Sequence, residues 1–279
     1  MDSSTSWFSQ GRIGEALQVG NTIFTSKFRW RILDKRKERD CQVSQEDSIE
    51  DFASYASIKL LCAEASNPSR WVFMRIYMQV PLKNTENEDA QTRALQAIQT
   101  KPKELIAYQT LANAPYVLKY VPELLDFEEH RQGSSNSFPA NLVPGGFLTI
   151  IVWEHVPGVL LGDGSGKATK FWDLKDPRER VTIREKFKEL IPKITKAGIW
   201  PKTAGPSNLI WCSETKSLHL VGFREWSHMP RQTWNAGWYP RFDLVRVPVD
   251  CHWSDSDWNG STSGWKWELD DFVAREQSS

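Results

Sequence analysis

Apolar and polar residues follow one another along the chain in patterns that predict several stretches of β-structure. The segment WVFMRIYMQVPL (71–82) is rich in β-branched and aromatic residues and is ended by a proline, which is typical of a strand. The apolar run FLTIIVWEHVPG (147–158) predicts a buried strand that ends in a Pro-Gly turn. Two shorter runs, NLIW and SLHLVGF, are joined by CSETK and predict a hairpin over residues 208–223.

The helical signals are strongest in the second half of the chain. Asp176 can cap a helix whose first position is Pro177, and Gly198 lies where that helix is expected to end. Pro192 falls inside the helix and is expected to kink it. The apolar residues of the segment recur on one helical face, which is formed by Ile183, Phe187, Leu190, Ile191 and Ile194.

The first half is predicted to hold helices between its strands. An acidic stretch between TIFTSKFRWRIL (22–33) and the strand at 71–82 predicts a helix, and TENEDAQTRALQAIQT (85–100) predicts another. KPKELIAYQTLANA (101–114) has a proline near its start and an apolar stripe, so it predicts a third helix. EEHRQGSSNSFPANLVPGG (128–146) has the composition of a loop.

This order of elements predicts an α+β protein with two lobes, in which an N-terminal sheet lobe precedes a more helical C-terminal lobe. A length of 279 residues suits one large domain or two lobes that share a cleft. We expect a mobile arm at 1–20, the N-terminal lobe at 21–152 and the C-terminal lobe at 153–279. Seven of the 14 Trp residues fall in the last 54 residues, where they serve either core packing or the wall of an aromatic pocket.

The composition excludes several classes of protein. Hydrophobic residues make up 40% and charged residues 25%, as in soluble globular proteins. The sequence has no run of eighteen apolar residues and no apolar core near its polar N-terminus, so we expect no membrane span, no secretory signal and a cytoplasmic location. The cysteines form no CxxC motif and no ligand spacing with the five His, so we expect reduced thiols, no metal site and no cofactor. These cysteines are Cys41, Cys62, Cys212 and Cys251.

One basic segment stands out in a chain whose net charge is zero. KFRWRILDKRKER (27–39) holds seven basic residues against Asp34 and Glu38, with Phe28 and Trp30 between them. The segment is either a solvated strand and turn or a patch that contacts phosphates. The absence of a net positive charge does not favour nucleic acid as a partner of the whole protein.

The stretch GIWPKTAGPSNLIWCSETKSLHLVGFREW (198–226) has the shape of a protein-kinase active site. Together with FMRIYMQVP, VPGGFLTIIVWEHVPGVLLGD and LHLVGFREW, it resembles the protein-kinase-like fold in its shorter aminoglycoside-phosphotransferase-like form. More narrowly, the chain resembles a group of kinase-like proteins of filamentous fungi. The resemblance covers about residues 55 to 230 and implies a cleft between two lobes.

The resemblance implies roles for residues that match kinase positions. Arg75 matches the strand lysine that holds nucleotide phosphates, and Glu104 matches the helix glutamate that pairs with it. Trp153 begins the segment that matches the hinge between the lobes. Asn208 keeps the metal-binding asparagine, and Arg224 replaces the last residue of Asp-Phe-Gly. The resemblance implies that Arg75, Trp153 and Arg224 bind substrate, and that Glu104 and Asn208 are catalytic.

The acids that phosphoryl transfer requires are missing from the matching positions. Thr203 stands where the catalytic aspartate would be, and Gly222 replaces the aspartate that holds magnesium. Thr203 therefore cannot act as a carboxylate base, although it remains a candidate catalytic residue for another reaction. The sequence also has no G-x-G-x-x-G motif. We therefore expect neither a bound metal nor an active kinase.

Several functions remain open for such a protein. The first is an enzyme or binding protein of fungal specialised metabolism, a pseudokinase in sequence, that uses the cleft for a small molecule. The second follows from a resemblance to fungal synthases of arginine-containing cyclic dipeptides, which are transferases that use aminoacyl-tRNA; Lys35, Arg36 and Lys37 would then contact the tRNA. The third is a non-catalytic pseudokinase scaffold. The sequence leaves the ligand and the oligomeric state open.

Overall fold

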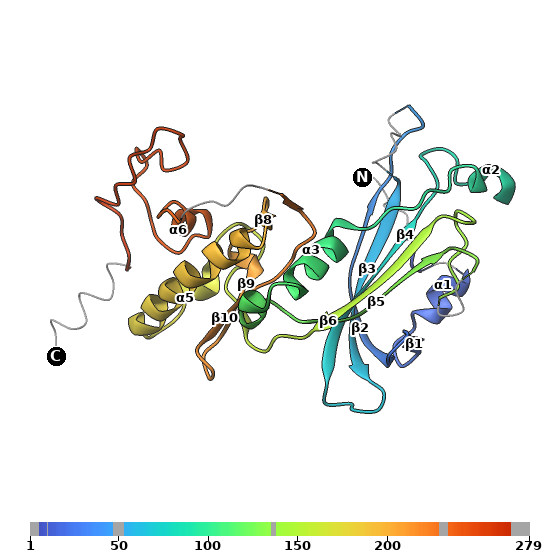
Figure 1. Cartoon of the computed structure of the whole chain (residues 1–279), viewed down its shortest axis with the longest axis horizontal. Helices are drawn as coiled ribbons and strands as arrows, with labels where there is room; N and C mark the ends of the chain where they lie inside the picture. The colour runs from blue at the N-terminus through green and yellow to red at the C-terminus, as the bar shows by residue number, and fades with distance from the viewer. Residues whose placement is uncertain (1–5, 10, 47–52, 135–137, 229–233, 269–279) are drawn as a thin grey trace. The chain divides into compact units, whose positions relative to one another are not determined.

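The computed structural model describes residues 6–9, 11–46, 53–134, 138–228 and 234–268, and the chain is a mixed α+β protein (Figure 1). It divides into two compact units. The first unit holds residues 1–106 and 123–155, and the second holds 107–122 and 156–279. The sequence placed a single boundary between residues 152 and 153, whereas this division falls after residue 155 and gives 107–122 to the second unit. None of the described helices is long and apolar enough to cross a membrane.

A six-stranded antiparallel sheet forms the first unit, with the strand order β1-β2-β3-β4-β6-β5 (Figure 1). The strands are β1 (Thr22–Phe24), β2 (Arg29–Cys41), β3 (Tyr55–Glu64), β4 (Trp71–Gln79), β5 (Leu124–Arg131) and β6 (Phe147–Glu154). The helices are α1 (Gly11–Ala16), α2 (Ala90–Ala94) and α3 (Lys103–Ala112), of which α3 runs across the boundary between the two units. The predicted strands at 71–82 and 147–158 are confirmed as β4 and β6, and the third helix is confirmed as α3.

One face of this sheet forms the core of the first unit. Every second residue of β3, β4 and β6 points to this face, because side chains alternate along a strand. The residues concerned are almost fully buried, and they are Ala56, Ile58, Leu60, Cys62, Val72, Met74, Ile76, Met78, Leu148, Ile150 and Val152. Ile13 and Leu17 of the α1 region join the same core.

The N-terminal segment packs against the sheet, so the prediction of a mobile arm at 1–20 is wrong for its described residues. Trp7 and Phe8 are only 4% and 1% exposed and belong to the core cluster. The indole N–H of Trp7 donates a hydrogen bond to Asp40 Oδ2 at 3.1 Å. The segment is polar overall, but two adjacent aromatic side chains bury enough apolar surface to fix it on the sheet. The first five residues and residue 10 lie outside the described residues.

Three other predictions for the first unit were wrong in whole or in part. The stretch predicted as a helix contains the long strand β3, whose apolar residues are buried on both faces of the sheet, while its acidic residues at 47–52 lie outside the described residues. Of the helix predicted at 85–100, only α2 is helical. It begins after Asp89, and the Asp89 side chain accepts hydrogen bonds from its first turn. The loop predicted at 128–146 begins as the second half of β5, which pairs with β6, and is confirmed for the described residues from 132 to 146. In each case strand pairing or a cap outweighed local composition.

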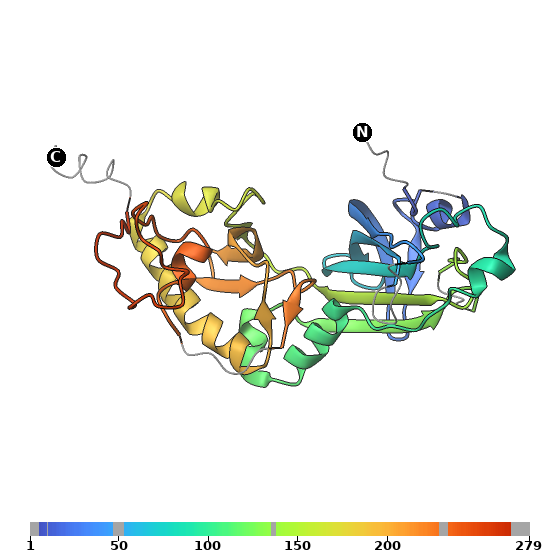
Figure 2. The ribbon, with the colours of Figure 1, turned by 90° about the horizontal axis from the view of Figure 1, so that it is seen from above.

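The long helix α5 (Pro177–Lys196) organises the second unit, as the sequence predicted (Figure 2). The side chain of Asp176 accepts a hydrogen bond from Arg178 N at 2.9 Å, which caps the helix. Gly198 follows the helix with a φ of +84°, a left-handed value that favours glycine. Pro192 lies inside the helix. The predicted apolar face is buried, and the predicted hairpin is confirmed as β9 (Leu209–Cys212) and β10 (Ser217–Leu220).

The remaining elements of the second unit are short. β7 (Val159–Leu160) pairs with β9 and extends the hairpin to three strands. A separate pair is formed by β8 (Trp200–Pro201) and β11 (Trp226–Ser227). The short helices are η1 (Pro115–Tyr120), α4 (Thr169–Trp172), η2 (Pro206–Asn208) and α6 (Trp238–Arg241).

The tryptophan-rich tail contributes to the core of the second unit. Trp238 and Trp265 are 4% and 6% exposed. The ring centroids of Phe187 on α5 and Phe242 lie 4.8 Å apart, and Trp258 stacks on Trp265 at 5.7 Å. Of the two uses that the sequence left open for these aromatic residues, core packing accounts for the described contacts.

Two buried arginines of α5 fix the end of the described chain. Arg180 and Arg184 side chains are 1% and 7% exposed, and both pair with the carboxylate of Glu268. The Nε of Arg180 lies 2.7 Å from Glu268 Oε2, and Nη1 of Arg184 lies 3.0 Å from Oε1. Burial lowers the pKa of Arg184 below the usual arginine value, although Glu268 acts in the opposite direction. One carboxylate therefore forms ion pairs with two buried guanidinium groups.

We expect Glu268→Gln to lower the free energy of unfolding of the second unit by about 2 kcal/mol, because it leaves two buried cations without their carboxylate. The value stands below that for a fully buried pair because the Glu268 side chain is 31% exposed. Urea unfolding measures the change, with Glu225→Gln, at an exposed acid of the same unit, as the control. Equal stability of the two variants would contradict a stabilising role of Glu268 beside the two buried arginines.

Candidate functional site

The sheet face opposite the core carries a group of polar and aromatic side chains. Lys59 of β3 is the direct partner of Arg75 on β4, and Phe73 of β4 is the direct partner of Trp153 on β6. Residues paired in this way project to the same face of a sheet, with Cβ atoms about 4.5–5.5 Å apart. The first unit therefore brings two cations and two aromatic rings together by strand register alone.

An ion pair between Arg75 and Glu104 lies at the centre of this group. Nη1 of Arg75 lies 2.7 Å from Oε1 and 2.6 Å from Oε2 of Glu104. The hydroxyl of Tyr77 donates a second hydrogen bond to Glu104 Oε2 at 2.8 Å. The Glu104 and Arg75 side chains are 1% and 12% exposed. The ion pair that the sequence predicted is therefore present, in the first turn of α3, where the helix dipole favours an acid.

The surroundings of Arg75 stabilise its charge. Burial by itself would lower the pKa of Arg75, but Glu104 and Tyr77 outweigh burial and raise it above the usual arginine value. The Arg75 guanidinium carbon also lies 5.5 Å from the centre of the Trp153 ring. Arg75 thus remains a cation with an aromatic ring beside it.

The positive charge of Lys59 is less well compensated by its neighbours than that of Arg75. Its Nζ lies 3.5 Å from the centre of the Phe73 ring and 5.8 Å from that of Trp153. Among the described residues, no acid forms an ion pair with Lys59. Burial, followed by the charge of Arg75, lowers the pKa of Lys59 from 10.5 to about 8, and only Glu104 acts against them. The chain therefore holds a largely buried amine that lacks a counter-ion in the described structure.

His155 and Arg36 border the same group. The rings of Phe73 and His155 lie 5.1 Å apart. Burial lowers the pKa of His155, and the charges of Lys59 and Arg36 lower it further. Arg36 also lowers the pKa of Lys59, although it forms its own ion pair with Asp34 at 3.1 Å. Three cations, Lys59, Arg75 and Arg36, therefore influence one another on this face.

The structure brings together three of the residues that the sequence singled out, namely Arg75, Glu104 and Trp153, within the first unit. The other three belong to the second unit. Thr203 is exposed in the loop before η2, and Arg224 is half-buried between β10 and β11. The catalytic and substrate-binding roles assigned to these residues stay predictions.

Asn208 is held by the backbone of its own loop. Its Oδ1 accepts a hydrogen bond from Gly205 N at 3.1 Å, and its Nδ2 donates one to Val221 O at 2.9 Å. The next residue, Gly222, has a φ of +85°, and a Cβ added there would lie 2.3 Å from Asn208 Nδ2. An aspartate at position 222 would therefore displace Asn208 as well as strain the backbone.

The three basic residues predicted to contact tRNA are exposed on β2. Lys37 is the strand partner of Lys59, so it borders the polar face of the sheet. Lys35, Arg36 and Lys37 also line a small pocket of about 140 Å³. The carboxylate of Glu38 in this pocket accepts hydrogen bonds from Ser6 Oγ and Phe8 N. A phosphate contact at this pocket stays a prediction.

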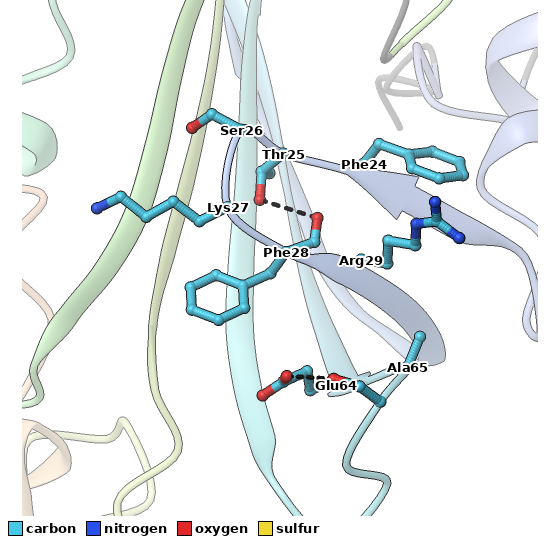
Figure 3. Close-up of a pocket in the computed structure, with 9 residues that line it drawn as sticks. Phe24, Thr25, Ser26, Lys27, Phe28, Arg29, Glu64 and Ala65 are labelled. Carbon is cyan, nitrogen blue, oxygen red and sulfur yellow. Dashed lines mark hydrogen bonds between the residues drawn. The ribbon is translucent and has the colours of Figure 1, made fainter.

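A larger, open hollow of about 540 Å³ lies at the turn between β1 and β2 (Figure 3). Figure 3 shows the ring of Phe28 and the side chain of Lys27 at this turn. The buried carboxylate of Asp126 fixes the turn by accepting hydrogen bonds from Ser26 Oγ and Lys27 N. The acid that lines the hollow, Glu64, already pairs with Arg70 at 3.0 Å. The acid of this hollow is therefore already neutralised by a neighbouring arginine.

The described residues contain no group of three or more His, Cys, Asp or Glu side chains that could hold a metal ion. Comparison of the chain with models of known protein families and with curated proteins finds no match. The candidate site therefore rests on the geometry of this chain. Lys59, Phe73 and Tyr77 were missed from the sequence, although a lone lysine inside the apolar run YASIKLLCAE was a signal that could have revealed Lys59.

Proposed function

We propose that the protein binds a small anionic ligand on the polar face of the first unit's sheet, with Lys59 and Arg75 as the groups that contact the anion. The observation that supports this proposal is the ammonium of Lys59, which is largely buried beside Arg75 and forms no ion pair with a described acid. A strongly shifted pKa with a specific charged neighbour is characteristic of functional sites.

The energetics of the group favour an anion. A buried ammonium without a partner destabilises the folded chain, and a carboxylate or phosphate beside it would remove that cost. Such a ligand would receive charge-assisted hydrogen bonds from both Lys59 and Arg75. The rings of Phe73 and Trp153 flank the two cations and would contact an apolar or planar part of the ligand. This arrangement combines charge recognition with an aromatic wall.

Within the kinase-like fold that the sequence resembles, we propose that this ligand site has replaced phosphoryl transfer. Thr203 offers no carboxylate base, and Gly222 offers no metal ligand. Asn208 uses both ends of its amide in backbone hydrogen bonds. We propose a role in fungal specialised metabolism, with the ligand processed or sensed at this site; dependence on aminoacyl-tRNA and a scaffold function remain alternatives to catalysis on a small molecule.

Anions are expected to raise the melting temperature of the protein when they replace chloride at constant ionic strength. Phosphate, citrate and ATP without magnesium serve as probes in a thermal-shift series. A ligand at 100 times its Kd that binds only the folded state stabilises it by about 2.7 kcal/mol. Magnesium is expected to add nothing to the effect of ATP, because the acids that would hold the metal are missing.

Lys59→Met is expected to abolish the anion effect, whereas Lys83→Met, at an exposed lysine of the same unit, is expected to preserve it. An unchanged anion effect in Lys59→Met would remove the proposed site. Stabilisation by ATP that requires magnesium would instead indicate a nucleotide site of the kinase type.

A further inference from the structure

We propose that Lys59 is a reactive amine that forms an imine with a small carbonyl compound carrying a carboxylate, of the 2-oxo acid or aldehyde acid class. This inference rests on the anion-binding part of the proposed function and goes beyond it. It assigns a covalent step to one residue and states the chemistry of the ligand.

The strand register places the amine and the anion contact at a suitable separation. Lys59 and Arg75 are direct partners on β3 and β4 and project to the same face. In a 2-oxo acid or in glyoxylate, the carbonyl carbon is bonded directly to the carboxylate carbon. A carboxylate held by Arg75 therefore brings the carbonyl carbon within reach of the flexible Lys59 side chain. The Phe73 ring covers one side of the amine and so limits the directions from which a ligand approaches it.

The charges around Lys59 favour its neutral, nucleophilic form. Arg75 faces it from β4, Arg36 and Lys37 lie on β2, and His155 follows β6. Both described acids near Lys59 on this face already have partners: Glu104 is engaged by Arg75 and Tyr77, and Asp34 of β2 pairs with Arg36. With a pKa of about 8, a substantial fraction of Lys59 is neutral near pH 8, whereas an ordinary lysine is almost fully protonated there.

The step balances without an oxidant or a reductant. The lone pair of Nζ attacks the carbonyl carbon, and the carbonyl oxygen takes up a proton to give a carbinolamine. Nitrogen then loses its proton as the hydroxyl leaves as water, so that one amine and one carbonyl give one imine and one water. The ligand carboxylate takes no part in the bond changes and serves to hold the carbonyl in place.

The test compares two aldehydes on the full chain at pH 8. Glyoxylate carries a carboxylate, and acetaldehyde has a similar carbonyl without a charge. After reduction with sodium cyanoborohydride, peptide mapping by mass spectrometry measures the modification of each lysine. We expect glyoxylate to modify Lys59 at least about tenfold faster than the exposed Lys83, since a substantial fraction of the Lys59 amine is neutral at this pH. We expect acetaldehyde to show a smaller preference.

The double variant Arg75→Gln with Glu104→Gln removes the anion contact while keeping the net charge of the pair at zero. It is expected to lose the extra preference for glyoxylate and to keep the labelling by acetaldehyde. If this variant does not fold, the wild-type protein can be labelled in excess sulfate. Sulfate is expected to bind both cations, and so to slow the modification of Lys59 by either aldehyde while the modification of Lys83 stays unchanged.

Equal labelling of Lys59 and Lys83 by glyoxylate, or no labelling of Lys59, would overturn the inference. If anions still stabilise the protein through Lys59 in that case, the proposed function stands and the covalent step fails. If neither effect is found, both fail.

Discussion

Replacement of Glu104 by glutamine is expected to lower the free energy of unfolding of the first unit by about 3–5 kcal/mol. The Glu104 side chain is 1% exposed and holds the guanidinium of Arg75 through both carboxylate oxygens. Without the carboxylate, Arg75 keeps a largely buried charge beside Lys59, and the two cations repel each other. The loss therefore combines an unpaired buried cation with a like-charge contact.

Two controls separate this effect from simple loss of an acid. Glu129→Gln removes a surface partner of Lys101, in a pair whose side chains are 40% and 39% exposed, and is expected to cost less than about 1 kcal/mol. The double variant Arg75→Met with Glu104→Met removes both charges and is expected to recover most of the loss. Urea unfolding measures the free energies, and hydrogen exchange of the β3 and β4 amides localises the change. A loss for Glu104→Gln no larger than that for Glu129→Gln would contradict the role of the ion pair.

The elements predicted correctly are those whose own residues determine them. β4 and β6 are long apolar runs with turn residues at their ends, and α5 carries both a cap and a helical apolar face. β3 was missed because the acidic residues that precede it dominated the local composition, while its place in the sheet depends on pairing with β2 and β4. The missed strand is the one that carries Lys59, so the site was predicted without one of its two cations.

The part of the site that the sequence did predict came from the resemblance to kinases. Arg75 and Glu104 are separated by 29 positions, and no local pattern links them; their contact is made by a strand and a helix that meet on the sheet face. The same resemblance singled out Asn208, but its amide is engaged by Gly205 and Val221. The match in residue type therefore identified Asn208 as a residue with a well-defined environment, but it did not predict that its amide would bond to the backbone.

Two aromatic residues of the N-terminal segment are enough to overturn the prediction of a mobile arm. Trp7 and Phe8 lie within a polar stretch whose average composition predicts no contact with the sheet. Their two side chains are nevertheless buried, and the backbone N–H of Phe8 donates a hydrogen bond to Glu38 of the basic segment. Phe8 lines the same small pocket as Lys35, Arg36 and Lys37, and these exposed basic residues belong to the ordered strand β2.

Lys59→Met is expected to stabilise the protein at pH 7 by up to about 3 kcal/mol, because the folded chain holds the charged amine at a cost that methionine does not incur. The folded-state pKa of about 8 lies below the ordinary value of 10.5, so between these two pH values the unfolded chain binds more protons than the folded chain. The free energy of unfolding of the wild-type protein should therefore rise from pH 8 to pH 10.5 through Lys59, and it should lack this contribution below pH 8.

The measurement is the difference between wild type and variant in urea unfolding at pH 7 and at pH 10.5, since other titrating groups cancel in that difference. We expect Lys59→Met to be the more stable protein at pH 7 and the gap to close at high pH, where both side chains are neutral. Lys83→Met, at an exposed position, should follow the wild type throughout. A variant less stable than the wild type at pH 7 would mean that the Lys59 ammonium is stabilised in the folded state, and the anion site would then lose its physical basis. A gap that closes as expected would show that the fold tolerates an uncompensated cation on this face, a cost that a bound anion would remove.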